Sequence, residues 1–245
     1  MPTLRRKVTS MRTARTTARG QGEPLTPAAI VDAALRLIDG GGLATFSTRK
    51  LGQALGVEAM ALYHHFPSRT ALLDAVAERL ITEVELPADV SDVIAWLRDV
   101  ARRYVAVARR HPEAFVLLAT RRFNTEAALR FVERVIAVLA GAGVRIDVAA
   151  DIFRGVGAFA NGAALADIAV RGAREEALVE RGVDAGRLPY VARAGQWLGP
   201  AHVERQFERN LDMLLAGVAW RLGQPAPAFG GRSKGAKKGG KSREA

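Results

Sequence analysis

The sequence contains no cysteine and few aromatic residues. Phe, Trp and Tyr together make up 6% of its 245 residues. Without cysteine, a disulfide framework, a thiolate zinc site and a cysteine nucleophile are all excluded. The absence is compatible with a reducing compartment, and we expect a cytoplasmic protein.

Long hydrophobic runs are also missing, although 49% of the residues are hydrophobic. The run of lowest polarity, near residues 156–166, contains Asn161 and falls well short of the roughly 18 residues that a membrane span needs. We therefore expect no membrane-spanning segment. The basic N-terminus lacks the apolar core of a secretory signal, although its composition resembles that of a mitochondrial transit peptide.

The net charge of +11 is carried by the two ends of the chain. Twelve of the 36 basic residues lie before residue 20 or after residue 231, which leaves 24 basic and 24 acidic residues between them. Both ends have few large apolar residues, so we predict a disordered basic arm over residues 1–24 and a disordered basic tail over residues 225–245. Such arms favour a polyanionic partner, most often nucleic acid. A role in solubility alone is the alternative.

The body between these ends has the apolar spacing of α-helices. A helix is predicted to start at Thr26-Pro27, a capping residue followed by proline at the first helical position, and to end at residues 40–42. Ser47 is expected to cap a second short helix over residues 48–55, and Gly56 to form the turn that follows it.

A third helix is predicted from about residue 58 to residue 65, which produces a helix-turn-helix pattern. Val57 and Leu62 are expected to be buried against the second helix, where Gly52 allows a close approach. Ala59, Met60 and Tyr63 would then face outward, as the residues of a recognition helix do. The spacing alone is only moderately specific.

Residues 25–81 resemble the N-terminal domain of the TetR family of repressors. The matching features are the opening helix with its AAL and GG motifs, the STRKLGQALGV segment, the ALYHHF segment, and the Ser-Arg-ALLDAV start of a fourth helix. The resemblance implies an all-α protein with a three-helix DNA-binding domain over residues 25–70. A helical ligand-binding and dimerisation domain would follow over residues 71–224. It also implies a ligand-responsive transcriptional regulator, namely a homodimeric repressor that a small-molecule inducer releases from its DNA operator and that needs no cofactor.

The resemblance further implies which residues contact DNA. They belong to the start of the second helix, the recognition segment and the start of the fourth helix: Ser47, Thr48, Arg49, Ala59, Met60, Tyr63, His64, His65, Ser68 and Arg69. Ala59 and Met60 are apolar, so contacts with thymine methyl groups are expected at these positions. For Tyr63, a half-buried core role is the alternative. A metal pair at His64 and His65 is disfavoured because adjacent helical residues point about 100° apart.

The segments HPEAFVLLATRR and GVGAFANGAALAD resemble the regulatory domain of the tetracycline-repressor branch. The resemblance implies an apolar pocket with a few polar groups. Its candidate lining is Trp96, Tyr104, Phe115, Leu118, Phe153, Phe159 and Asn161. Each of these residues also suits plain core. Leu118 stands where the tetracycline repressor has a histidine that ligates the drug's metal, so no metal site is expected.

Two further patterns concern packing. Small residues concentrate between Gly155 and Ala163, and an apolar stripe runs from Val203 to Leu222. We interpret both as surfaces for a symmetric partner, with glycine-rich flexibility around the pocket as the competing explanation. A further apolar stripe is expected on a helix over residues 129–139, and Leu129 is expected to be one of its inward-facing residues.

A nucleoid-type architectural DNA-binding protein with little sequence preference is the second functional hypothesis. An enzyme that uses His111 or His202 is a third, but no predicted helix carries an enzyme motif. The protein is therefore not expected to be an enzyme.

Overall fold

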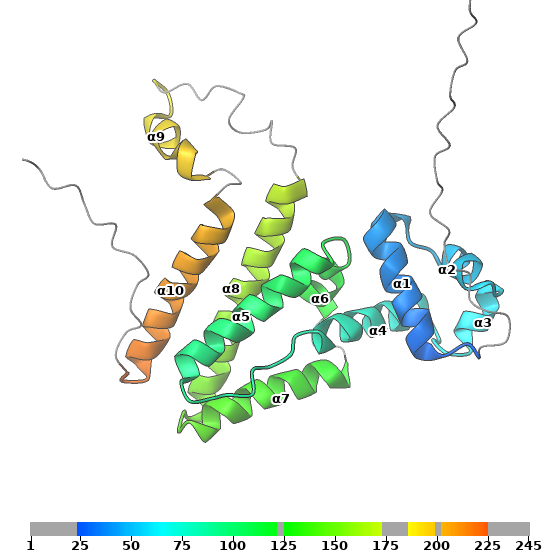
Figure 1. Cartoon of the computed structure of the whole chain (residues 1–245), viewed down its shortest axis with the longest axis horizontal. Coiled ribbons are helices and arrows are strands. Elements are labelled where there is room, and N and C mark those ends of the chain that lie inside the picture. The colour runs from blue at the N-terminus through cyan, green and yellow to red at the C-terminus, as the bar shows by residue number, and fades with distance from the viewer. Residues whose placement is uncertain (1–23, 122–124, 173–185, 199–201, 225–245) are drawn as a thin grey trace, which may run out of the picture. The chain divides into compact units, whose positions relative to one another are not determined.

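The computed structural model describes residues 24–121, 125–172, 186–198 and 202–224. In these ranges the chain forms α-helices, one short 3-10 helix and loops, with no strand (Figure 1). The expected all-α class is therefore confirmed. Contacts divide the chain into two units, Met1–Leu72 and Leu73–Ala245. Residues 1–23 and 225–245, nearly all of both predicted basic tails, lie outside the described residues.

The first unit is built from short helices whose ends follow local sequence signals. Thr26 caps α1, since its Oγ1 accepts a hydrogen bond of 3.2 Å from the Ala29 N–H, and Ser47 caps α2 in the same way through the Lys50 N–H at 3.2 Å. Both predicted caps are confirmed. The 3-10 helix was not predicted. The elements are α1 (Pro27–Gly41), η1 (Leu43–Thr45), α2 (Thr48–Leu55), α3 (Ala59–Tyr63) and the beginning of α4 (Arg69–Thr82).

The second unit is built around the contact between α5 and α8. Helix α5 makes its most extensive contacts with α8, and α8 also packs against α7 and α10. Trp96, Leu97 and Tyr104 on α5 are all buried, as their helical spacing predicts. The elements are α5 (Val93–Arg110), α6 (Phe115–Arg121), α7 (Glu126–Gly141), α8 (Ile146–Gly172), α9 (Pro189–Leu198) and α10 (Val203–Arg221).

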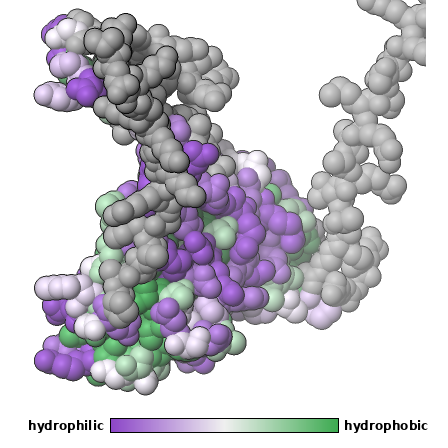
Figure 2. Space-filling model, turned by 60° about the vertical axis from the view of Figure 1, so that its left-hand side comes forward, coloured by the Kyte–Doolittle hydropathy of each residue, from purple (hydrophilic) through white to green (hydrophobic). Residues whose placement is uncertain are grey.

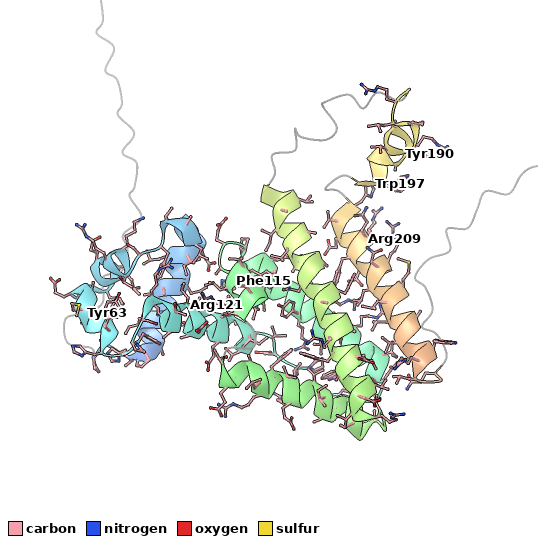
Figure 3. All side chains as sticks on the ribbon, turned by 180° about the vertical axis from the view of Figure 1, so that it is seen from behind. Tyr63, Phe115, Arg121, Tyr190, Trp197 and Arg209 are labelled. Carbon is pink, nitrogen blue, oxygen red and sulfur yellow. The ribbon has the colours of Figure 1, made fainter. Side chains whose placement is uncertain are left out.

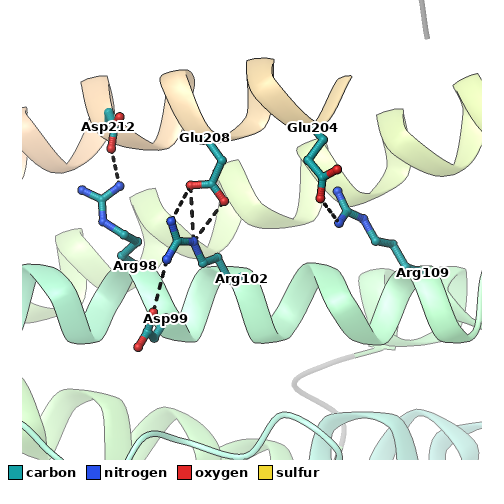
Figure 4. Close-up of polar contacts among 7 residues, drawn as sticks. All are labelled: Arg98, Asp99, Arg102, Arg109, Glu204, Glu208 and Asp212. Atoms are coloured by element: carbon teal, nitrogen blue, oxygen red, sulfur yellow. Dashed lines mark hydrogen bonds and ion pairs between the residues drawn. The ribbon is translucent and has the colours of Figure 1, made fainter. Parts of the chain in front are cut away.

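Ion pairs join α10 to α5 along their length. Arg98 pairs with Asp212, Arg102 with Glu208 at 2.8 Å, and Arg109 with Glu204 at 3.0 Å (Figure 4). As the residue number rises along α5, the number of its partner on α10 falls, so the two helices run antiparallel.

Arg109 also pairs with Asp167 of α8 at 2.8 Å. Asp167 is 3% exposed and is the one buried charged residue of the described chain. A buried carboxylate without a cation would be strongly destabilising. Arg109 therefore links α5, α8 and α10 at one point.

The structure differs from the predictions for two apolar stripes, residues 203–222 on α10 and residues 129–139 on α7. The interpretation of residues 203–222 as a surface for a partner was wrong, because Phe207, Leu211 and Leu215 are buried within the protomer, where α10 packs on α5 and α8. On α7, the predicted inward residue Leu129 is 57% exposed. On α7 the buried residues are instead Ala128, Val135 and Leu139, so the apolar spacing located the buried face only in part.

The exposed apolar residues of α10 are instead Met213 and Trp220, which are 59% and 82% exposed. Figure 2 brings the side of the molecule that carries α10 forward, and hydrophobic side chains gather at the lower edge of this face. Within the described ranges, every helix is too short or too polar to cross a membrane.

Candidate nucleic-acid interface and ligand cavity

The turn between α2 and α3 depends on two glycines. Gly56 has a φ of +69°, in the left-handed region that favours glycine. Gly52 lies against the start of α3: a Cβ at this position would be 2.8 Å from the Val57 carbonyl oxygen and 3.2 Å from the Ala59 nitrogen. The backbones of the two helices therefore touch at Gly52, as the sequence predicted.

Helix α3 is held mainly by one buried residue. Leu62 is 2% exposed, whereas Met60 is 71% and Tyr63 is 39% exposed. The helix covers Ala59–Tyr63 rather than residues 58–65, and Val57 is half-buried rather than buried. Tyr63 lies at the outer side of its unit, on α3 (Figure 3). This exposure favours the outward role of Tyr63 over the core role.

The remaining DNA-contact candidates flank α3 within the described chain. Arg49 is exposed near the start of α2, and Thr48 beside it is half-buried. His64 and His65 follow α3 and are exposed. Ala59 is half-buried because its backbone meets Gly52.

Two candidates at the start of α4 have local partners that fix their positions. The Ser68 hydroxyl accepts a hydrogen bond of 3.1 Å from the Ala71 N–H and so caps the helix. The guanidinium carbon of Arg69 lies 5.7 Å from the centre of the Phe46 ring, within the range of a cation–π contact. Arg69 therefore has a supported position beside a helix N-terminus, a place that attracts phosphate.

Lys50 is a cation of this surface that the sequence analysis did not single out. Its Nζ donates a hydrogen bond of 2.8 Å to the Thr45 carbonyl oxygen. Its position directly after Arg49 was the signal that could have found it.

The second unit contains an apolar cavity of about 200 Å³. Helices α5, α7 and α8 supply most of its wall, together with Ile81 from the end of α4. The lining residues are Ile81, Leu97, Val100, Ala101, Tyr104, Ala128, Phe131, Val132, Val135, Phe153, Arg154, Val156, Gly157, Ala158 and Ala160.

Of the seven predicted pocket residues, Tyr104 and Phe153 line this cavity. Asn161 lies just outside it, where its Oδ1 accepts a hydrogen bond of 3.1 Å from the Tyr104 hydroxyl. Phe115 packs edge-on against the Tyr104 ring, with 5.5 Å between ring centres. Both residues therefore act on the position of Tyr104.

The other three predicted pocket residues belong to the surrounding core. The indole N–H of Trp96 donates a hydrogen bond of 3.0 Å to the Pro87 carbonyl oxygen. Phe159 stacks on Phe207, with ring centres 5.8 Å apart, and Leu118 is fully buried.

Phe131 and Arg154 line the cavity but were not predicted to do so. Phe131 follows the buried Ala128 by three residues and precedes Val135 by four, so the helical period was the signal that could have found it. Arg154 directly follows Phe153, and no local signal distinguishes it from a surface arginine.

The histidines outside the first unit have structural partners. His111 Nε2 lies 3.1 Å from Glu83 Oε2, and His202 lies beside Trp197, with ring centres 5.5 Å apart. Among the described residues, no group of three or more His, Asp or Glu side chains is placed to hold a metal ion.

The first unit contains a helix-turn-helix whose short second helix is exposed, and the second unit contains an apolar cavity. Together these features are typical of one-component regulators, which bind both DNA and a small molecule. Family models support this class. The tetracyclin repressor-like C-terminal domain matches residues 86–222, and the model described as bacterial regulatory proteins, tetR family, matches residues 30–76. The chain belongs to the TetR family, and it is a ligand-responsive, DNA-binding transcriptional repressor.

Individual relatives agree with this assignment over most of their length. The chain is 32% identical to an HTH-type transcriptional regulator of Saccharopolyspora erythraea over 217 residues, 81% of this chain and 86% of the relative. It is 28% identical to the HTH-type transcriptional repressor DrrR1 of Streptomyces coeruleorubidus over 234 residues, 88% and 86% of the two chains. The structure of the TetR family protein ActR of Streptomyces coelicolor in complex with (S)-DNPA is similar, with a TM-score of 0.68, 26% identity, and coverage of 81% of this chain and 99% of ActR.

Proposed function

We propose that this protein is a homodimeric repressor whose paired α3 helices read an operator and whose cavity accepts a small-molecule inducer. The observation that carries the proposal is the combination of an outward-facing α3 with an apolar cavity in the family's regulatory region. A binding switch of this kind needs no cofactor, metal or catalytic step, so we propose no enzymatic activity. Because operator DNA lies in the bacterial cytoplasm, the protein would act there.

On the DNA side, we assign two roles to the exposed residues. Met60 and Ala59 would meet base edges through apolar contact, because neither side chain can donate a hydrogen bond. Arg49, Tyr63, His65 and Arg69 would contact phosphates, which position the protein but carry little sequence information. Ser47, Thr48, His64 and Ser68 complete the proposed set.

Small residues on an exposed face of α8 support the proposed dimer. Gly155, Ala158 and Gly162 recur at helical spacing and are exposed, and no atom lies within 4 Å of a Cβ built at either glycine. Gly217 on α10 is equally open and lies between the exposed Met213 and Trp220. These faces would pack against a second copy, and a two-fold axis would place the recognition helices about 34–36 Å apart, in successive major grooves.

On the ligand side, the wall of the cavity predicts a mainly apolar inducer. Tyr104 and Arg154 are the polar residues among its lining, and the rest is aliphatic, aromatic or glycine. ActR, a relative of known structure, binds an organic small molecule, (S)-DNPA. An inducer that binds one spacing of the recognition helices better than another shifts the protein between them.

The sequence preference for DNA tests the first part of the proposal. Duplexes selected from a random pool by the full chain would be compared with scrambled duplexes of the same length at one salt concentration. A specific repressor should bind the selected duplex at least about 10³-fold more tightly. A ratio close to one would instead support the architectural protein.

A cavity-filling variant tests the second part. No atom lies within 4 Å of a Cβ built at Gly157, which lines the cavity, so Gly157→Leu should fill the space without disturbing the helix. Gly141→Leu is the matched control, because Gly141 is equally open but lies outside the cavity. We expect Gly157→Leu to retain operator binding and to lose binding of the neutral fluorescent probe N-phenyl-1-naphthylamine. Retained probe binding would contradict the assignment of the cavity.

A further inference from the structure

A second hollow adjoins the cavity and shares two of its wall residues, Ile81 and Phe131. It has a volume of about 450 Å³ and lies between the segment that follows α4 and one face of α7. Its lining is Ile81, Thr82, Val84, Glu85, Leu86, Ala127, Arg130, Phe131 and Arg134. The two hollows are therefore neighbours on either side of a common wall.

The charges of the two hollows differ from those of the rest of the protein body, which is neutral in sum. Arg154 is the charged residue of the cavity lining, which includes no Asp or Glu. The second hollow has two arginines and one carboxylate, Glu85. Arg130 pairs with Glu126 at 3.2 Å. No carboxylate of the described residues forms an ion pair with Arg154 or Arg134, although most arginines of α5 have such a partner.

Arg154 has the better position to bind a ligand group. It lies on α8 next to Phe153 and one turn before Ala158, where its side chain is exposed to solvent and also lines the mouth of the apolar cavity. A cation at the edge of a water-poor cavity attracts an anion more strongly than an exposed cation does. The guanidinium fork also matches the geometry of a carboxylate or sulfonate.

We propose that the inducer is an amphipathic organic acid, with an apolar ring system in the cavity and its acidic group on Arg154. The Tyr104 hydroxyl, which donates to Asn161, keeps lone pairs and so can accept a hydrogen bond from a hydroxyl of the same ligand. This inference rests on the proposed function, because it assigns a ligand class to the proposed inducer cavity. Arg154 is the residue that determines specificity for the acid.

Two fluorescent probes that share one ring system test the charge requirement. 1-Anilinonaphthalene-8-sulfonate is an anion, and N-phenyl-1-naphthylamine is the same skeleton without the sulfonate. When each probe is titrated into the full chain at fixed salt, the anion should bind about tenfold more tightly than the neutral probe. This ratio corresponds to the lower end of the free-energy range for a hydrogen bond to a charged group. Equal affinities would overturn the proposal.

Arginine variants locate the anion subsite. Arg154→Gln should remove the preference for the anion and leave the affinity of the neutral probe unchanged, and Arg154→Lys should restore part of the preference. Arg134→Gln is the matched control in the adjoining hollow and should leave both affinities unchanged. Loss of the preference in Arg134→Gln but not in Arg154→Gln would overturn the assignment to Arg154, as would an equal loss of both probes in Arg154→Gln.

The failure of this inference can be told apart from the failure of the proposed function. If Gly157→Leu abolishes binding of both probes but the anion has no advantage, the cavity remains the ligand site and the acid requirement is wrong. If Gly157→Leu leaves both probes bound, the cavity is not their site, and the proposed inducer site fails together with this inference.

Discussion

Tyr63 is 39% exposed and lies at the end of a helix that has one buried residue, Leu62. Its side chain is more exposed than that of Leu62, which anchors α3, and less exposed than that of Met60. Part of the side chain can therefore support α3 while the exposed part is available to DNA.

The substitution Tyr63→Phe separates these two roles. If the hydroxyl donates to a phosphate, operator affinity should fall by roughly 0.5–1.5 kcal/mol, the net value of one hydrogen bond. The melting temperature should stay the same, since the ring remains. Fluorescence anisotropy with the selected duplex measures the change. An unchanged affinity would favour a packing role.

Glu83 lies within ion-pair distance of two arginines and a histidine of the second unit. Its carboxylate lies 2.8 Å from Arg79, 3.0 Å from Arg110 and 3.1 Å from His111. Burial raises the pKa of Glu83, but the interaction with His111 and the hydrogen bonds from Arg110 and His111 lower it. The pKa of Glu83 therefore lies below its ordinary value of 4.5. The carboxylate thus ties the end of α4 to the end of α5.

The sign of this pKa shift predicts how stability depends on pH. A lowered pKa contributes stability above the unfolded value, and the contribution is lost as the pH falls from about 4.5 through the folded pKa. Glu83→Gln should therefore cost about 1.5–3 kcal/mol at pH 7. The difference from the parent should shrink below the ordinary pKa, as followed by urea unfolding at several pH values.

Glu126→Gln is the control for this series, because its pair with Arg130 is largely exposed and contributes little. A stability difference for Glu83→Gln that persists unchanged to pH 3 would show that the carboxylate charge is not the source of the stabilisation.

At the scale of elements, the contact between α2 and α3 leaves almost no space for a side chain at Gly52. Gly52→Ala would place a methyl group 2.8 Å from a backbone oxygen, and backbone cannot rotate away as a flexible side chain can. We expect a loss of about 1–3 kcal/mol from overpacking and a parallel loss of operator affinity, because α3 must shift.

The control for this variant is Gly40→Ala, where no atom lies within 4 Å of the new Cβ. That change should leave stability equal or raise it, since alanine favours a helix. Thermal unfolding and operator binding measure both variants. Equal stabilities for the two alanine variants would contradict the close contact.

Local signals in the sequence were sufficient for the helix caps and the α2–α3 turn of the first unit. Thr26, Ser47 and Gly56 act within three or four residues of their own positions, so their capping and turn roles could be predicted without knowledge of the tertiary fold. The length of α3 could not, because a five-residue helix depends on its neighbours rather than on its own propensity.

Long-range features were harder to predict. Only two of the proposed pocket residues line the cavity, because a cavity is the space that neighbouring side chains fail to fill and no single position encodes it. Arg154 has the sequence signature of a surface residue and becomes a candidate only through the shape around it. The stripe on α10 had the right period, but the period does not tell a partner from the protein's own α5 and α8.

At the scale of the whole molecule, open glycines allow the proposed dimer to be tested without damage to the protomer. No atom of the described chain lies within 4 Å of a Cβ built at Gly162, which is exposed. Gly162→Trp should therefore leave protomer stability equal or slightly higher, while it weakens self-association and, with it, binding to a two-part operator.

Sedimentation over a range of concentrations measures this effect, and Gly141→Trp serves as the control at an equally open glycine of α7. A Gly162→Trp dimer as tight as the parent would show that this face of α8 is not the interface.

The three tryptophans give the chain its own optical reporter of assembly. Trp96 is buried with its indole N–H bonded to Pro87, whereas Trp220 is 82% exposed beside the proposed dimer face and Trp197 is 51% exposed. Trp96 should emit at short wavelength and be shielded from acrylamide at any concentration. A Trp220→Phe variant would isolate the contribution of Trp220. If association covers Trp220, dilution should shift emission to the red and increase quenching in the parent much more than in this variant, without any attached dye.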